Sequence, residues 1–270
     1  YSLLLCKITK RILTLMPNTL FVGKVCVKLD SVASTQTYLK NLYAKSKPIE
    51  GTAILSYNQT AGYGQRNNSW ETQNGLNIAL SLVLLPAFLN PDKQYYLSMA
   101  VALAVKKAVE ELSQQKVKLK WPNDIMVGDR KISGILIESN LFNSRVEKSY
   151  VGIGLNVNQI DFGSLKSTAT SLSNISGKEY DLDHVCILIM EWVERYYLQI
   201  KAGRLKELFE EYDEALYKKN EYITLLHSDD MTSKVLLKGV EENGKILVMH
   251  ENGELRAYLH GEDQIMKVPL

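Results

Sequence analysis

The sequence predicts an α+β protein in which a mixed β-sheet with helices is followed by a small all-β module. Three observations support this fold class. In residues 76–85, Leu and Ile alternate with smaller or polar residues, which is typical of a strand. Residues 95–115 place their apolar side chains on one face of a helix. From Tyr222 onward, short Val, Ile and Leu runs are separated by turn sequences such as Glu-Asn-Gly at 242–244.

Composition and charge argue against some classes of function. The chain has 270 residues, 46% of them hydrophobic and 23% charged, with a formal net charge of +2. Such a balance gives no global attraction to nucleic acid or to an anionic membrane. From Lys219 onward acidic residues outnumber basic ones, which disfavours nucleic-acid binding by the last module. Cys6, Cys26 and Cys186 are odd in number and scattered, which favours reduced thiols in a cytoplasmic protein.

The first residues are interpreted as an N-terminal extension, 1–19. The apolar run at 3–6 is too short for a secretory signal, and the basic residues follow it instead of preceding it. Because Met16 comes just before the first predicted strand, we expect translation to begin there. The predicted units are then residues 20–218, with a mixed sheet and helices, and the β module 219–270.

The remaining elements follow from capping and hydrophobic patterns. The helix after the first strand is expected to begin at Ser34 and Thr35, hydroxyl residues suited to an N-cap. A later helix is expected to be capped by Asp183. The other predicted elements, in order, are strands at 20–29 and 52–57, a hairpin pairing 125–127 with 132–137, a strand at 150–158, and helices at 183–201 and 205–219.

A long polar loop, residues 58–71, lies between two predicted strands. Gly62 and Gly64 resemble the start of a dinucleotide fingerprint, but Asn67 replaces the third glycine and no amphipathic helix follows. A Rossmann site is therefore not expected. A glycine-bearing loop of this length in a compact domain is typical of a ligand lid.

Residues 120–138 concentrate the groups that an anionic ligand requires. Asn123 and Asp124 follow a proline, where the strand ladder loses a donor. Lys131 lies at the turn of the predicted hairpin, and Gly134 follows it. A cation, a carboxylate and an amide this close together indicate a site for a phosphorylated ligand and its metal. A charged surface hairpin is the alternative interpretation.

The strand at 150–158 has one face that is almost without side chains. Gly152 and Gly154 occupy alternate positions, and Asn156 is the next residue on that face. Glycine at every second position weakens a strand unless a backbone or a ligand approaches closely. A packed helix would also explain the pattern, but Asn156 favours a ligand.

Taken together and in order, these motifs resemble the biotin protein ligases that lack an N-terminal DNA-binding domain. The motifs are the loop 59–70, KWPND at 120–124, RKISGILIE at 130–138, GIGLNVN at 152–158 and Ala-Thr-Ser at 169–171. The resemblance covers roughly residues 27–172 by motif and continues by layout to the last module. It implies a catalytic domain related to the class II aminoacyl-tRNA synthetases, followed by an SH3-like β-barrel.

The resemblance implies a two-step reaction. The carboxylate of biotin attacks the α-phosphate of ATP to give biotinyl-5′-AMP, and a lysine of a biotin carboxyl carrier protein then takes the biotinyl group. Because a carboxylate and a polyphosphate repel each other, the site needs a fixed cation and Mg²⁺. Lys131 is the expected cation, and Asp124 is expected to place the metal. The implied partner is the carrier domain of a carboxylase such as acetyl-CoA carboxylase, and the fold relation allows a homodimer.

The resemblance also assigns the site residues. Lys131 and Arg66 are the catalytic residues. The positions implied for biotin are Ser34, Thr35, Gln59, Gly62, Gly64, Trp70, Lys131 and Gly134. The positions implied for ATP are Arg66, Trp121, Asn123, Asp124, Lys131 and Asn156.

The loop departs from the family pattern, GRGRxGRxW, at its basic positions. Tyr63 and Gln65 occupy two of the arginine positions, so Arg66 is the basic residue that remains. We therefore expect Arg66 to help retain the adenylate, with peptide amides of the closed loop replacing the other guanidinium groups.

Three other functions compete with this interpretation. A lipoate or octanoate ligase shares the fold and also uses a lysine near an acyl-adenylate. A biotin-sensing repressor needs a helix-turn-helix domain ahead of the catalytic domain, and only about twenty residues precede the first strand, so DNA binding is not expected. A binding role without catalysis is the third alternative. No membrane association is expected.

Overall fold

Two β-sheets and five α-helices form the computed structural model, which describes residues 10–11, 15–65, 68–226, 231–259 and 264–265. The large sheet has the order β1-β2-β3-β4-β8-β7-β6-β5, with β2 and β3 parallel and the other neighbours antiparallel. The small sheet, β12-β11-β10-β9-β13, is antiparallel. The predicted α+β class, with a mixed sheet and a second β unit, is confirmed.

The strands of the large sheet are β1 (Lys10–Arg11), β2 (Cys26–Leu29), β3 (Ala53–Ser56), β4 (Asn77–Leu84), β5 (Val117–Lys120), β6 (Asp124–Val127), β7 (Arg130–Phe142) and β8 (Arg145–Asn156). Those of the small sheet are β9 (Tyr222–Leu226), β10 (Thr232–Val240), β11 (Ile246–Met249), β12 (Leu255–Tyr258) and β13 (Gln264–Ile265). The helices are α1 (Thr35–Ser46), α2 (Tyr95–Ser113), α3 (Leu172–Ser176), α4 (Leu182–Lys201) and α5 (Leu205–Glu214).

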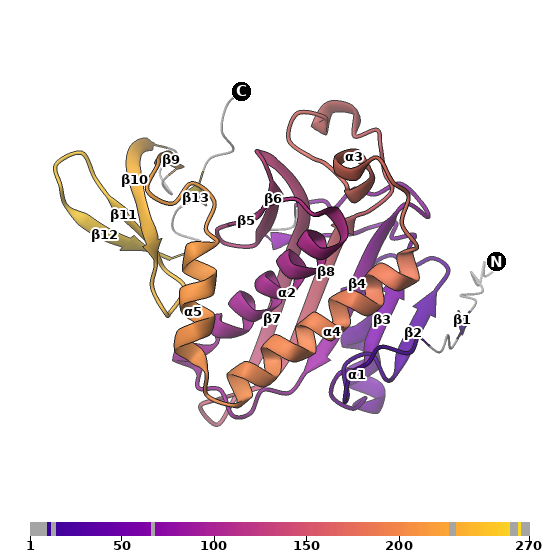
Figure 1. The fold of residues 1–270 in the computed structure, drawn as a ribbon. Helices are drawn as coiled ribbons and strands as arrows, with labels where there is room; N and C mark the ends of the chain where they lie inside the picture. Colours follow the sequence, from indigo (N-terminus) through magenta and orange to yellow (C-terminus); the bar gives the residue numbers. More distant parts are fainter. Residues whose placement is uncertain (1–9, 12–14, 66–67, 227–230, 260–263, 266–270) are drawn as a thin grey trace, which may run out of the picture.

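Helices cover the two faces of the large sheet unequally. Figure 1 shows α2 and α4 side by side across one face, and they pack on each other there. The opposite face is covered by α1, which packs on β3, β4 and β8 around Leu39 and Tyr150. Over β7 and β6 that second face is left to loops. This asymmetry leaves room for a site beside α1.

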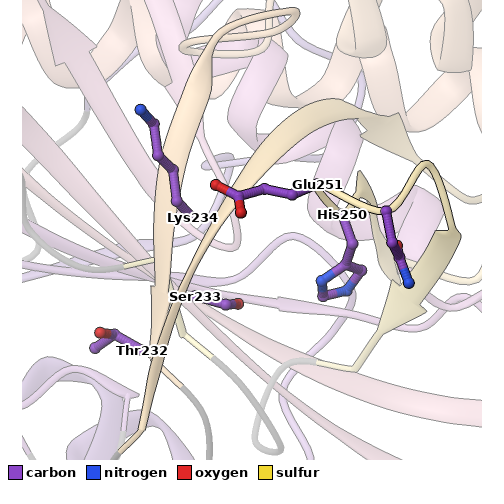
Figure 2. A pocket seen from close by; sticks show the side chains of 6 residues that line it. Thr232, Ser233, Lys234, His250 and Glu251 are labelled. Atoms are coloured by element: carbon purple, nitrogen blue, oxygen red, sulfur yellow. The ribbon is translucent and has the colours of Figure 1, made fainter.

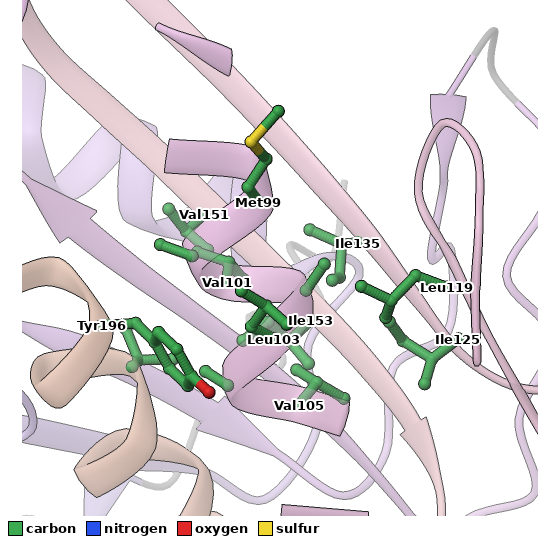
Figure 3. Close-up of a cluster of buried hydrophobic side chains, with 14 of the residues drawn as sticks. Met99, Val101, Leu103, Val105, Leu119, Ile125, Ile135, Val151, Ile153 and Tyr196 are labelled. Atoms are coloured by element: carbon green, nitrogen blue, oxygen red, sulfur yellow. The ribbon is translucent and has the colours of Figure 1, made fainter. Parts of the chain in front are cut away.

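The main core lies between α2, α4 and the large sheet. Figure 3 shows Met99, Leu103 and Val105 of α2 against side chains of the strands, with Tyr196 of α4 beside them. Each fully buried aliphatic side chain of this kind stabilises the fold by about 1.5–3 kcal/mol. All of β4 is buried, although its sequence alternates as a one-sided strand would. Cover on both faces of the sheet explains the difference.

The first predicted strand is shorter than the sequence suggests. Only Cys26–Leu29 pairs in the sheet, whereas residues 20–22 are held by a carboxylate of α4. Glu194, which is 5% exposed, accepts hydrogen bonds from the main-chain N–H groups of Leu20, Phe21 and Val22. Leu15 is also buried in the main core. The packed region therefore begins before residue 20, the predicted boundary of the first unit.

We expect Glu194→Gln to destabilise the protein by about 1.5–3 kcal/mol, because a buried carboxylate that accepts three N–H groups is replaced by a neutral amide. Urea unfolding measures this loss. Glu191→Gln is the matched control, since its partly exposed carboxylate on the same helix accepts one N–H, that of Asn18. The control should lose no more than about 0.5 kcal/mol. Equal losses in the two variants would contradict this account of Glu194.

The N-cap of α4 is Asp181, which accepts from the main-chain N–H of His184, so the predicted cap at Asp183 is wrong. Asp183 instead accepts from Lys28 Nζ and from the Tyr57 hydroxyl. Burial acts to raise the pKa of the Asp183 carboxyl, but these two partners outweigh it and lower the pKa. Because the Asp183 carboxylate already accepts from Lys28 and Tyr57, it does not cap α4.

The β module packs directly on the first unit. The Trp121 indole N–H donates to the carbonyl of Gly244 at 2.9 Å, and Gly244 lies against the ring of Tyr95. Val235 and Ile246 of the module belong to the same hydrophobic cluster as α2. The two units thus share a continuous core, and the predicted boundary at 218 stays a prediction.

Cys26 and Cys186 are buried free thiols, whereas Cys6 lies outside the described residues. Burial, aided by the charge of Asp183, raises the pKa of the Cys26 thiol to about 12. Protonated, enclosed thiols of this kind serve packing. In the described part of the chain, none of the helices combines the length and the apolar character that crossing a membrane requires.

Candidate active site

A row of small residues crosses the large sheet on the face that α1 leaves partly open. Ser56, Ala79, Gly154 and Gly134 stand opposite one another on β3, β4, β8 and β7, and the row ends at Asp124 on β6. Residues that are paired across strands project to the same face, at about 4.8 Å per strand. The row therefore forms a floor with almost no side chains, which we call the glycine floor.

Trp70 from the polar loop lies on the glycine floor. A Cβ added to Gly154 would stand 2.5 Å from the indole, and one added to Gly134 would stand 3.2 Å from it. A side chain at Gly154 would therefore collide with the indole, and one at Gly134 would force the ring to shift by a few tenths of an ångström. The main-chain N–H of Trp70 donates to the carbonyl of Gly62 at 2.9 Å, which ties the ring to the start of the loop.

One end of the floor carries a cation and a carboxylate. Lys131 Nζ lies 2.6 Å from Asp124 Oδ1, and the two side chains are 33% and 24% exposed. The backbone of Lys131 pairs with residues 168–170 through two hydrogen bonds, to Thr168 and from Thr170. A partly exposed ion pair contributes only about 0–1 kcal/mol to stability. Lys131 can therefore exchange Asp124 for a ligand anion at little cost.

The other end gathers hydroxyl and amide groups at the start of α1. Ser34 caps the helix by accepting from the N–H of Thr37, as predicted. The N–H and hydroxyl of Thr35 donate to Gln59 Oε1 at 2.9 and 3.2 Å. A Cβ on Gly62 would stand 2.9 Å from the main-chain oxygen of Trp70, which favours glycine there. The structure thus brings Ser34, Thr35, Gln59 and Gly62 together.

Three buried polar side-chain atoms have no hydrogen-bond partner among the described residues: Gln36 Oε1, Trp70 Nε1 and Thr170 Oγ1. The first two lie 3.0 and 2.8 Å from where a Cβ on Gly152 and on Gly154 would stand. Thr170 lies beside the end of β8, where its carbonyl accepts from the side-chain amide of Asn156. Unpaired buried polar groups cost about 1–3 kcal/mol each. Their alignment along β8 indicates a polar ligand.

The predicted residues are not all at the floor. The Trp121 side chain is 2% exposed and lies in the core, bound to the β module. The Asn123 amide donates to the carbonyl of Ile135 and braces β7. Gly64 bonds with Asn68 inside the loop. Arg66 lies outside the described residues.

Sequence reasoning missed Gln36 and Ser81, which both belong to the site. Ser81 on β4 donates its hydroxyl to Thr35 Oγ1 at 2.9 Å. Neither residue carries a signal in the sequence, because each reaches the site only through helix geometry or strand register. Only their positions could have drawn attention to them: Gln36 directly follows Thr35, and Ser81 lies within a buried strand.

The residues at the cation end fit a metal that arrives with its ligand. Among the described residues no group of three or more His, Cys, Asp or Glu side chains could hold a metal ion. Asp124 alone offers a carboxylate beside Lys131. Mg²⁺ is commonly bound by one or two carboxylates together with substrate phosphates, and Asp124 meets that requirement.

A separate hollow of about 430 Å³ lies on the β module, between β10 and the turn that leads to β12 (Figure 2). None of the residues that the sequence assigned to a site lines it. Its lining is polar and exposed in part: Thr232, Ser233, Lys234, His250, Glu251 and Asn252. The glycine floor therefore stays the candidate ligand site.

Comparisons with known proteins agree with this geometry. The family model of the biotin/lipoate A/B protein ligases matches residues 29–156. The chain is 32% identical over 248 residues to the bifunctional ligase/repressor BirA of Bacillus spizizenii, covering 89% of this chain and 74% of that protein. It is 35% identical over 202 residues to the Bacillus subtilis protein of the same name, covering 72% of this chain and 61% of that one.

A solved structure matches over nearly its whole length. The biotin protein ligase from Aquifex aeolicus, in complex with biotin and ATP, gives a TM-score of 0.77 at 30% identity and covers 89% of this chain and 98% of that one. Fold and site together define an enzyme of the biotin/lipoate A/B protein ligase class. Within that class, the chain belongs to the biotin protein ligase family.

Proposed function

We propose that this protein activates biotin as biotinyl-5′-AMP with ATP and transfers the biotinyl group to a lysine of a biotin carboxyl carrier protein. The observation that carries the proposal is the glycine floor, with Lys131 and Asp124 at one end and Thr35 and Gln59 at the other. A long ligand with a polar head and an acidic tail would match the groups at the two ends of the glycine floor. The names of the relatives support biotin as that ligand.

The head group binds at the start of α1. The N–H and hydroxyl of Thr35 already donate to a carbonyl-type oxygen, that of Gln59, so they suit the carbonyl of the ureido ring. Ser34 fixes the first turn of the helix, and Ser81 orients the Thr35 hydroxyl. The acyl chain then runs towards Lys131 packed against the indole of Trp70, which lies on Gly154 and Gly134.

Lys131 drives the first step by neutralising charge. Its ammonium lies between the biotin carboxylate and the α-phosphate, so that the carboxylate oxygen can attack phosphorus and pyrophosphate can leave. Asp124 holds the ammonium until ligand arrives. When Mg²⁺ is bound with the nucleotide, Asp124 and phosphate oxygens would hold it, and it supplies further neutralisation of the phosphates.

The loop protects the product of that step. Trp70 covers the floor and excludes water from the mixed anhydride. Arg66 is assigned to the retention of the adenylate. In the second step the amine of the carrier lysine attacks the acyl carbonyl, and AMP leaves. Trp121, Asn123 and Asn156 remain proposed for the nucleotide, Trp121 and Asn123 through the backbone that they brace.

The finer fold description belongs to the same proposal. Residues 20–218 are assigned to a catalytic domain of the class II aminoacyl-tRNA synthetase type, and residues 219–270 to an SH3-like barrel. A homodimer is proposed to form through the free edge of a sheet, and analytical ultracentrifugation of the protein tests this. The carrier partner is assigned to the carrier domain of acetyl-CoA carboxylase or a related carboxylase.

Incubation with ATP, Mg²⁺ and biotin tests the proposal, with pyrophosphate release as the first readout. Addition of a biotin carboxyl carrier domain should then give a carrier that is heavier by one biotinyl group, read by mass spectrometry. Lipoate and octanoate are the competing substrates, since the wider family includes their ligases. Pyrophosphate release with lipoate and none with biotin would overturn the assignment.

A further inference from the structure

Gln36 lies at the second position of α1, directly after Thr35, and is 4% exposed. Its side-chain nitrogen, Nε2, donates two hydrogen bonds of 3.0 Å, one to Glu138 Oε2 and one to the carbonyl of Tyr150. A carboxylate and a carbonyl can only accept. Both bonds therefore need the amide nitrogen on that side, and the amide oxygen must point the other way.

The oxygen of Gln36 points at Gly152, which lies on the same face of β8 as Gly154 of the glycine floor and two residues before it. It lies 3.0 Å from the position that a Cβ on Gly152 would take, and no donor among the described residues satisfies it. An isolated buried acceptor of this kind destabilises the protein, because in the unfolded chain the same oxygen is bound to water. Turning the amide over would lose two bonds to gain none. The protein therefore holds an acceptor ready for a donor that approaches along β8.

Glu138 and Lys40 fix this orientation. Lys40 Nζ lies 2.6 Å from Glu138 Oε2, the oxygen that accepts from Gln36. Burial acts to lower the pKa of Lys40, but the hydrogen bond to Glu138 and its charge outweigh burial and raise the pKa. The charged lysine therefore lies against the same carboxylate oxygen of Glu138 that accepts from Gln36. Glu138 is thus a positioning residue for the amide.

We propose that Gln36 determines specificity at the head-group end of the site, by accepting a hydrogen bond from a ureido N–H of biotin. This inference rests on the proposed function. A cyclic urea carries two N–H donors beside its carbonyl, so it needs acceptors next to the donors of Thr35. The dithiolane ring of lipoate has no N–H, so it would leave the Gln36 oxygen buried and unpaired. Sites built to bond a substrate N–H discriminate strongly against analogues that lack it.

Gln36→Met tests the proposal, because it keeps the length of the side chain and removes the acceptor. Calorimetric titration should show biotin and desthiobiotin, which share the cyclic urea, binding about tenfold more weakly, as expected for one lost hydrogen bond. Affinity for ATP should stay unchanged, and lipoate should compete better against biotin in adenylate formation. Thr37→Val, on the exposed face of the same turn, is the matched control and should bind biotin normally.

The outcomes separate this inference from the proposed function. Unchanged biotin affinity in Gln36→Met overturns the inference, as does a loss shared equally by biotin and ATP, which would mark a structural role. Glu138→Gln gives an independent check, since an amide at 138 no longer enforces the orientation of Gln36, and biotin should bind more weakly than to the native protein. If the native protein itself binds no biotin, the proposed function fails instead.

Discussion

Lys131→Ala should lower adenylate formation by about 10²–10³-fold, to near the background rate. The loss follows because the ammonium acts where charge develops, in a site that excludes water, and effects of this size are typical for the removal of one such group. The fold should survive, since the ion pair of Lys131 with Asp124 is partly exposed and contributes little to stability. Pyrophosphate release with biotin and ATP measures the rate, and thermal unfolding checks the fold.

Lys148→Ala is the matched control for this variant. Lys148 is another partly exposed lysine of the large sheet with a carboxylate partner, Glu147, but it lies away from the glycine floor. It should retain the native rate. Lys131→Arg should remain impaired, because a planar guanidinium does not replace a compact ammonium. Near-native turnover in Lys131→Ala would remove Lys131 from the catalytic role.

Gly154→Val should weaken the binding of biotin and of ATP by about a hundredfold or more. Valine suits a strand, so β8 should form normally, but its Cβ would stand 2.5 Å from the indole of Trp70. Trp70 belongs to a loop and can move away, which spares the fold. A ligand that packs against the indole is displaced with the ring, and overpacking of a close contact costs about 1–3 kcal/mol or more.

Equilibrium binding measures this effect, and Glu147→Val is the control. Glu147 is an exposed position on the same strand, so valine there changes β8 without touching the floor. Binding losses of the same size in both variants would show that the strand, and not the floor, had been damaged. Native binding in Gly154→Val would show that the ligand does not pack against the indole.

Much of the site was predictable because its residues are close in sequence. Asp124, Lys131 and Gly134 lie within one hairpin, and the N-cap at Ser34 follows from residue type alone. The strand register that completes the site was not predictable in this way. The pairing that sets Ala79, Gly154 and Gly134 in one row depends on which strands are neighbours in a mixed sheet, and local patterns do not encode that choice.

Other differences have local physical causes. Residues 20–25 have strand propensity, but the buried carboxylate of Glu194 accepts from the N–H groups of residues 20–22 before a neighbouring strand can. Two aspartates near the start of α4 compete for the cap, and Asp183 is removed from that competition by Lys28 and Tyr57. Both outcomes depend on partners more than a hundred positions away in sequence, which a local reading does not include.

The bond from Trp121 to Gly244 gives the β module an indirect part in catalysis. Trp121 is three residues before Asp124, and its indole is anchored outside the catalytic unit. The module thus braces the segment that carries Asp124, the carboxylate proposed to bind the metal. Trp121→Phe removes this bond and keeps the core that the two units share, and we expect it to lose rate. Its defect should lie in the nucleotide step, with biotin affinity retained, and separate titrations of biotin and ATP would detect that pattern.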